Sequence, residues 1–256
     1  MGGRSVATWI LSAILFFGSG RLPAEQAADR TVIVSFAEDN APYTWVSDGH
    51  LVGLELDIVA AAFALAGYRV EAVPRPYRRL PTILSNEKID GTTGVRPEEL
   101  PGFYSSKPYM YYDNYAIVRK DSGIVLHGIS DLFDHSVVSW AGAAKHLGLE
   151  RKVPDKLAAA RDKTYFELPD EAMTYKYFWS RRAEILLADK YIYQWYLRTH
   201  PDVGASASAV TYFKIFEETA SFAEFRTPGL RDDFEHGLRR LQETGDYQRI
   251  LDRYLR

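Results

Sequence analysis

The sequence predicts an α/β protein of two lobes, joined by a hinge of about two crossing segments. Strand and helix patterns alternate twice along the 256 residues, the order typical of mostly parallel sheets flanked by helices. Two amphipathic helices follow the second α/β unit, and the chain can bury them economically by returning to the first unit. Such a path leaves a cleft between the lobes, and clefts of this kind are favoured sites for small ligands.

The first unit begins with a β-branched, apolar strand at 31–36. The segment 54–67 predicts a helix, because Leu54 and Ile58 fall on one face at helical spacing and Gly67 can end it. The remaining elements of this unit are a strand at 68–74, a short helix at 78–88 and a strand at 89–95.

The second unit has a strand at 135–140, a helix opened by Gly142, a buried strand at 184–188 and a helix after it. The two C-terminal helices are separated by Thr244 and Gly245. We therefore expect a first lobe of 31–118 and 214–256, a second lobe of 123–208, and a hinge near 116–123 and 208–214.

The N-terminus predicts a cleaved signal peptide over 1–24. Arg4 is followed by an apolar run from Val6 to Phe17, too short to span a bilayer comfortably, and Ala24 is a small residue suited to cleavage. A retained anchor or a buried helix is the alternative. The chain has no cysteine, which excludes thiol catalysis and lipid anchoring through an N-terminal cysteine. We expect an exported, periplasmic protein.

Four segments occur in an order that resembles family 3 of the bacterial extracellular solute-binding proteins, the amino-acid-binding type of ABC transporters. They are NAPYTW (40–45), LVGLELDIVAAAFALAG (51–67), RAEILLAD (182–189) and GLRRLQETGDYQRILDRYL (237–255). The resemblance implies the type II periplasmic-binding fold. It also implies closure of the two lobes on a small polar solute, an amino acid or a related carboxylate or amine, for a membrane ABC permease. We expect a monomer.

The resemblance places an aspartate that binds the ammonium group of the solute at Asp189. A carboxylate suits that role, although Asp189 could equally cap the helix that follows its strand. The carboxylate-binding arginine of the family falls at Glu99, inside Arg96-Pro97-Glu98-Glu99. Arg96 could supply the guanidinium instead, or could be a surface arginine. The two glutamates suit a helix start behind Pro97.

Further candidate ligand-binding residues lie in the loops around the expected cleft. Tyr77 falls where the family often has a cleft tryptophan and Arg78 offers a second anion contact; alternatively, Tyr77 packs under its loop and Arg78 faces water. Tyr43, Trp45 or Trp140 could cover the solute. The amides of Gly142 and Ala143 could bind an anion at the start of a helix. The remaining candidates are Asn40 and the hydroxyls of Thr92 and Thr93.

Two other function classes stay open: an exported dehydratase-like enzyme on the same fold, and a ligand-sensing subunit for a signalling partner. An enzyme would need a general acid or base in the cleft. The sequence has no HExxH, GxSxG or Walker pattern, so we assign no catalytic residue, no metal ligand and no cofactor. The net charge of −3 argues against a nucleic-acid partner.

Overall fold

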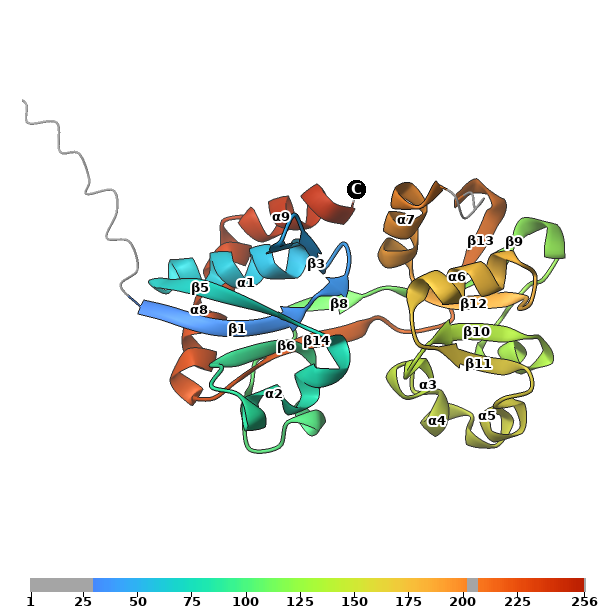
Figure 1. The fold of residues 1–256 in the computed structure, drawn as a ribbon, viewed down its shortest axis with the longest axis horizontal. Coiled ribbons are helices and arrows are strands. Elements are labelled where there is room, and N and C mark those ends of the chain that lie inside the picture. The colour runs from blue at the N-terminus through green and yellow to red at the C-terminus, as the bar shows by residue number, and fades with distance from the viewer. Residues whose placement is uncertain (1–29, 202–206, 256) are drawn as a thin grey trace, which may run out of the picture.

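The computed structural model describes residues 30–201 and 207–255, which form two α/β lobes lying side by side (Figure 1). The predicted signal peptide over 1–24 lies outside the described residues. Within the described ranges, no helix is both long enough and apolar enough to cross a membrane.

The first lobe is built on a sheet with the order β5-β1-β6-β14-β7, in which β8 also pairs with β14. Strand β1 pairs in parallel with β5 and β6, whereas β14 runs antiparallel to β6. A small sheet, β2-β3-β4, lies beside it. The strands are β1 (Arg30–Ala37), β2 (Asp39–Asn40), β3 (Thr44–Ser47), β4 (His50–Val52), β5 (Tyr68–Arg75), β6 (Gly91–Val95), β7 (Tyr104–Ser105), β8 (Met110–Tyr112) and β14 (Thr219–Phe225).

The helices of the first lobe come from both ends of the chain. They are α1 (Leu54–Leu65), α2 (Leu80–Asn86), α8 (Pro228–Glu243) and α9 (Asp246–Leu255). Ile58 and Phe63 of α1 share one buried core with Leu238 of α8 and Ile250 of α9. Burial of these apolar faces is the main force that holds the C-terminal helices in place. The chain therefore returns to the first lobe after completing the second.

The second lobe has a five-stranded sheet with the order β11-β10-β12-β9-β13. Strand β10 pairs in parallel with β11 and β12, while β9 runs antiparallel between β12 and β13. Its elements are β9 (Asn114–Arg119), β10 (Val137–Trp140), α3 (Ala143–His146), α4 (Leu149–Lys152), α5 (Pro154–Ala160), β11 (Tyr165–Leu168), α6 (Glu171–Trp179), β12 (Ile185–Asp189), α7 (Lys190–Thr199) and β13 (Val210–Phe213).

Two segments cross between the lobes, at places that differ from the expected 116–123 and 208–214. Strand β9 belongs wholly to the second sheet, where Ala116, Ile117 and Val118 are buried. The first crossing is therefore at Asp113, between β8 and β9, and the second is at 214–218, between β13 and β14. An ion pair of 3.0 Å from Lys214 to Asp113 joins the two crossings. The sequence alone could not show which sheet this strand joins.

Candidate functional site

A cavity of about 750 Å³ lies between the lobes and is lined by residues of both. Its position, at the carboxyl ends of parallel strands and between two domains, is where α/β proteins commonly bind small ligands. The lining is rich in charged and aromatic side chains: Glu38, Asp39, Tyr77, Arg78 and Tyr112 from the first lobe, and Trp140, Asp170, Glu171, Tyr175 and Asp189 from the second.

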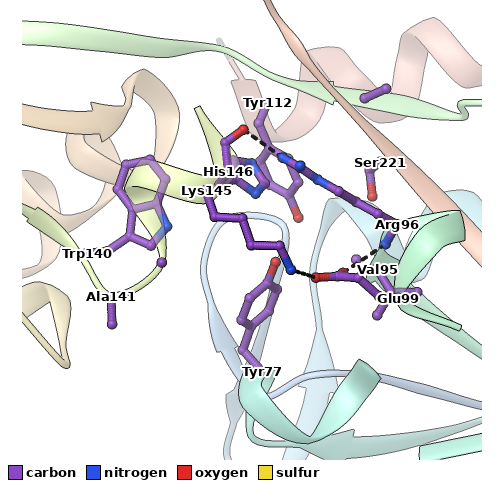
Figure 2. Close-up of a pocket in the computed structure, with 13 residues that line it drawn as sticks. Tyr77, Val95, Arg96, Glu99, Tyr112, Trp140, Ala141, Lys145, His146 and Ser221 are labelled. Carbon is purple, nitrogen blue, oxygen red and sulfur yellow. Dashed lines mark hydrogen bonds and ion pairs between the residues drawn. The ribbon is translucent and has the colours of Figure 1, made fainter. Parts of the chain in front are cut away.

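A smaller cavity of about 120 Å³ adjoins the large one and shares Tyr77, Tyr112 and Trp140 with it. Figure 2 shows its residues, with Arg96 and Glu99 of the first lobe facing Lys145 and His146 of the second. The two cavities together make the interlobe cleft.

The structure brings most of the predicted site residues to this cleft. The large cavity is lined by Asn40, Tyr77, Arg78, Trp140 and Asp189, and the small one by Tyr77, Arg96, Trp140 and Gly142.

Four predicted residues line neither cavity: Tyr43, Thr92, Thr93 and Ala143, each 0% exposed. The hydroxyl of Ser35 donates a hydrogen bond of 2.8 Å to Thr92 inside the sheet. The threonines are buried because β6 is the central strand between β1 and β14, covered on both faces. The structure therefore does not place the threonine hydroxyls in the described cavities.

Asp189 ends β12 and caps α7, because its carboxylate accepts hydrogen bonds from the backbone N–H groups of Tyr191 (2.8 Å) and Ile192 (3.0 Å). It also accepts from the N–H of Asp113 (2.7 Å) and from the hydroxyl of Tyr43 (3.1 Å), which reaches it from the first lobe. Burial raises the pKa of Asp189 to about 6, although these hydrogen bonds pull it down. The capping alternative is thus confirmed, and contact with a solute stays a prediction.

Arg96 fits neither predicted alternative, a guanidinium free to bind a solute carboxylate or a surface arginine. Its guanidinium donates a hydrogen bond of 2.6 Å to the backbone carbonyl of His146, across the cleft (Figure 2). Beside it, Glu99 forms an ion pair of 3.1 Å with Lys145 of the second lobe. Arg96 is therefore neither a free surface arginine nor a free guanidinium: it bridges the lobes.

The glutamates after Arg96 form a helix start, as the sequence predicts, although the helix is a single 3₁₀ turn, Pro97–Glu99. The side chain of Glu99 accepts a hydrogen bond of 3.1 Å from the N–H of Arg96 and so closes the turn. Glu99 consequently has two partners, one within its own loop and one on the other lobe.

The amides at the start of α3 have an internal partner that sequence reasoning missed. Glu167 of β11 accepts hydrogen bonds from the N–H of Gly142 (2.8 Å) and the N–H of Ala144 (2.7 Å). The parallel register of β10 and β11 sets Ser139 opposite Glu167 and so brings this carboxylate to the helix start. The single acidic residue in the strand segment YFEL was the available signal.

The acidic lining of the cleft was also missed. Glu171 begins α6 beside the cavity, and partial burial together with Asp39 and Asp189 raises its pKa to about 8. The opposite effect acts on His146, whose pKa is lowered to about 4 by burial and by Arg96, so the ring is neutral at pH 7. The available sequence signal was the acidic pair Asp170-Glu171.

No group of three or more histidine, aspartate or glutamate side chains within 30–201 and 207–255 is arranged to hold a metal ion.

The sequence model of the family described as "Bacterial extracellular solute-binding proteins, family 3" matches residues 32–256. Among curated proteins, the arginine-binding extracellular protein ArtP of Bacillus subtilis (strain 168) is 21% identical over 253 residues, covering 97% of this chain and 95% of that protein. Both the family and this relative are binding proteins by description.

Solved structures give the same picture of the fold. A histidine kinase sensor domain with similarity to periplasmic binding proteins superposes with a TM-score of 0.71 and 16% identity, covering 89% of this chain and 97% of that one. An ancestral arginine-binding protein bound to arginine superposes with a TM-score of 0.68 and 18% identity, covering 90% of this chain and 100% of that one. At these identities the likeness shows a shared two-lobe fold.

Proposed function

Because the chain belongs to the bacterial extracellular solute-binding proteins of family 3, we propose that it captures a small polar solute and delivers it to a membrane ABC permease. The observation that carries the proposal is the cavity of about 750 Å³ between the lobes, lined by polar and aromatic side chains of both. The solute belongs to the amino acids or to related carboxylates and amines. The expected signal peptide would bring the protein to the periplasm, where it acts as a monomer.

Closure of the lobes supplies the mechanism. The two crossings at Asp113 and 214–218 are the only backbone connections between the lobes within the described residues, which suits a hinge. A solute that touches both lobes gains contacts only in the closed form, and this differential affinity stabilises closure. A permease can then distinguish the loaded protein from the empty one by shape.

Several contacts across the cleft hold the lobes together in the described arrangement. Besides Arg96 to His146, the hydroxyl of Tyr43 donates to Asp189, and the rings of Trp45 and Trp195 lie 5.6 Å apart between centroids. Each contact joins a residue of the first lobe to one of the second. These contacts support a closed form whose stability solute binding would increase.

Mass spectrometry of the solute released from freshly purified protein is the direct test. Calorimetry and thermal shift of the refolded, stripped protein against amino acids, small carboxylates and amines would then give the affinity. We expect one class of small solute to bind tightly and to raise the melting temperature. Turnover of a prephenate-like acid, with no tight binding to any solute, would instead favour a dehydratase and overturn the proposal.

A further inference from the structure

The large cavity has a strongly acidic lining. Glu38 and Asp39 face it from the first lobe, and Asp170, Glu171 and Asp189 from the second, whereas Arg78 is the single arginine or lysine among its lining residues. His146 also lines it, but its lowered pKa of about 4 leaves the ring uncharged near neutral pH. A solute in this cavity therefore meets an excess of negative charge from both lobes.

Three of these carboxylates neither cap a helix nor pair with another described side chain. Asp170 and Asp189 cap helices through their side chains. In contrast, the carboxylates of Glu38, Asp39 and Glu171 make no hydrogen bond or ion pair with any described residue, although all three line the cavity. Burial and like charges facing one cavity are costly, which is why the pKa of Glu171 is raised to about 8, and a bound cation relieves that cost and favours the ionised form of Glu171.

Aromatic rings complete a lining suited to cations. Tyr77, Tyr112 and Trp140 border both the large and the small cavity. Their faces carry negative electrostatic potential, which attracts ammonium and guanidinium groups. Carboxylates and aromatic rings in one cavity are the two kinds of partner that organic cations prefer.

Most of the groups that could bind a carboxylate are already engaged, and the exception is Arg78, which lines the large cavity without a hydrogen bond or ion pair to any described residue. The amides of Gly142 and Ala144 donate to the carboxylate of Glu167 at 2.8 and 2.7 Å. The guanidinium of Arg96 donates to the carbonyl of His146, and the ammonium of Lys145 pairs with Glu99. A carboxylate brought into the cleft would therefore meet Arg78 alone, among the five lining carboxylates, or would have to displace one of these internal partners.

We propose that the solute is a small organic cation, a diamine or a guanidino-amine, that carries no carboxylate beside its amine. The inference rests on the proposed function, since it names the class of solute for the same cleft. The free carboxylates of Glu38, Asp39 and Glu171 bind its ammonium or guanidinium groups, and the aromatic rings pack on its carbon chain and charged ends.

Pairs of solutes that are identical except for the carboxylate provide a direct test of this proposal. Calorimetry of the stripped protein compares agmatine with arginine, putrescine with ornithine, and cadaverine with lysine. We expect the amine of at least one pair to bind at least tenfold more tightly than its amino acid. An amino acid that binds as tightly as its amine, or an anionic solute recovered from the purified protein, overturns the cation inference and leaves the proposed function standing. Failure to bind any solute overturns both.

Substitution of the cavity-lining carboxylates tests whether they bind the amine. Glu171→Gln and Asp39→Asn each replace a cavity-lining carboxylate that makes no hydrogen bond or ion pair with a described residue, so both proteins should fold. We expect each to weaken binding of the preferred amine about tenfold, with Glu150→Gln as the control, because Glu150 pairs with Arg161 on the surface of the same lobe as Glu171. Unchanged affinity in both cleft variants contradicts the assignment.

Discussion

The guanidinium of Arg96, in the loop after β6, donates a hydrogen bond of 2.6 Å to the carbonyl of His146 at the end of α3. The two residues belong to different lobes, so this bond exists only while the cleft is closed. The neighbouring pair of Glu99 and Lys145 spans the same gap. Together they form a latch beside the small cavity, where the sequence predicted a carboxylate-binding arginine.

Replacement of Arg96 by alanine should shift the ligand-free protein toward an open form. A hydrogen bond from a charged donor contributes about 1.5–3 kcal/mol, and water recovers part of this when the lobes separate. We expect a five- to thirtyfold rise in the ratio of open to closed molecules, seen as a larger radius of gyration in small-angle scattering. Arg78→Ala is the control, because Arg78 lines the cleft without a hydrogen bond or ion pair to any described residue. Equal radii for the two variants would show that the latch does not hold the lobes.

The packing of α8 on α1 predicts a contrast between two glycines of one helix. A Cβ atom added at Gly237 would lie 1.9 Å from the carbonyl oxygen of Ala62, whereas one added at Gly229 would meet nothing within 4 Å. We expect Gly237→Ala to lower the free energy of unfolding by about 3 kcal/mol or more through overpacking. Gly229→Ala should raise it by about 0.5–1 kcal/mol, since alanine favours the helix. Urea unfolding measures both, and a stable Gly237→Ala protein would refute the close approach of α8 to α1.

Local patterns explain why much of the fold was predictable. Leu54, Ile58 and Ala62 recur at helical spacing, and the structure buries all three on the inner face of α1. The same periodicity could not show that Glu55, next to Leu54, is also buried, because its partner Tyr109 lies 54 residues away. Patterns along the chain predict elements, while the partners of buried polar groups depend on contacts distant in sequence.

The candidate site illustrates the same limit. Resemblance to the family placed Asp189 and the loop of Arg96 at the cleft, and both line it. Sequence could not foresee that Arg96 reaches His146, 50 positions later, or that Glu167 covers the amides of Gly142 and Ala144. These contacts follow from the closure of the lobes and from strand register, which no motif records.

Buried Glu55 predicts a pH dependence of stability. It is 1% exposed and accepts a hydrogen bond from the hydroxyl of Tyr109. Burial raises its pKa from 4.5 to about 7, against the effect of its hydrogen bonds. Because the folded state favours the protonated acid, the stability gained from this shift is complete below pH 4.5 and is lost as the pH rises through 7.

Glu55→Gln should remove that dependence, because an amide stays neutral at every pH. Between pH 4.5 and pH 8, the unfolding free energy of the variant should rise by about 3 kcal/mol relative to that of the wild type. Urea titrations at several pH values measure it, with Glu243→Gln, an exposed position on α8, as the control. A difference that is constant with pH would mean that folding leaves the pKa of Glu55 unshifted.

Removal of Glu167 should change the selectivity of the cleft. In the wild type, the N–H groups of Gly142 and Ala144 donate to the carboxylate of Glu167. Glu167→Ala frees these N–H groups and so offers them to a solute carboxylate. We expect the affinity for arginine to rise about tenfold relative to that for agmatine, with a loss of about 1 kcal/mol in stability as the helix start loses its cap. Calorimetry on the variant gives the ratio, and Glu150→Ala, which removes a surface glutamate of the same lobe, should leave it unchanged. If the ratio in Glu167→Ala equals that of the wild type, the amides do not face the bound solute, and the selectivity between amine and amino acid arises from the acidic lining alone.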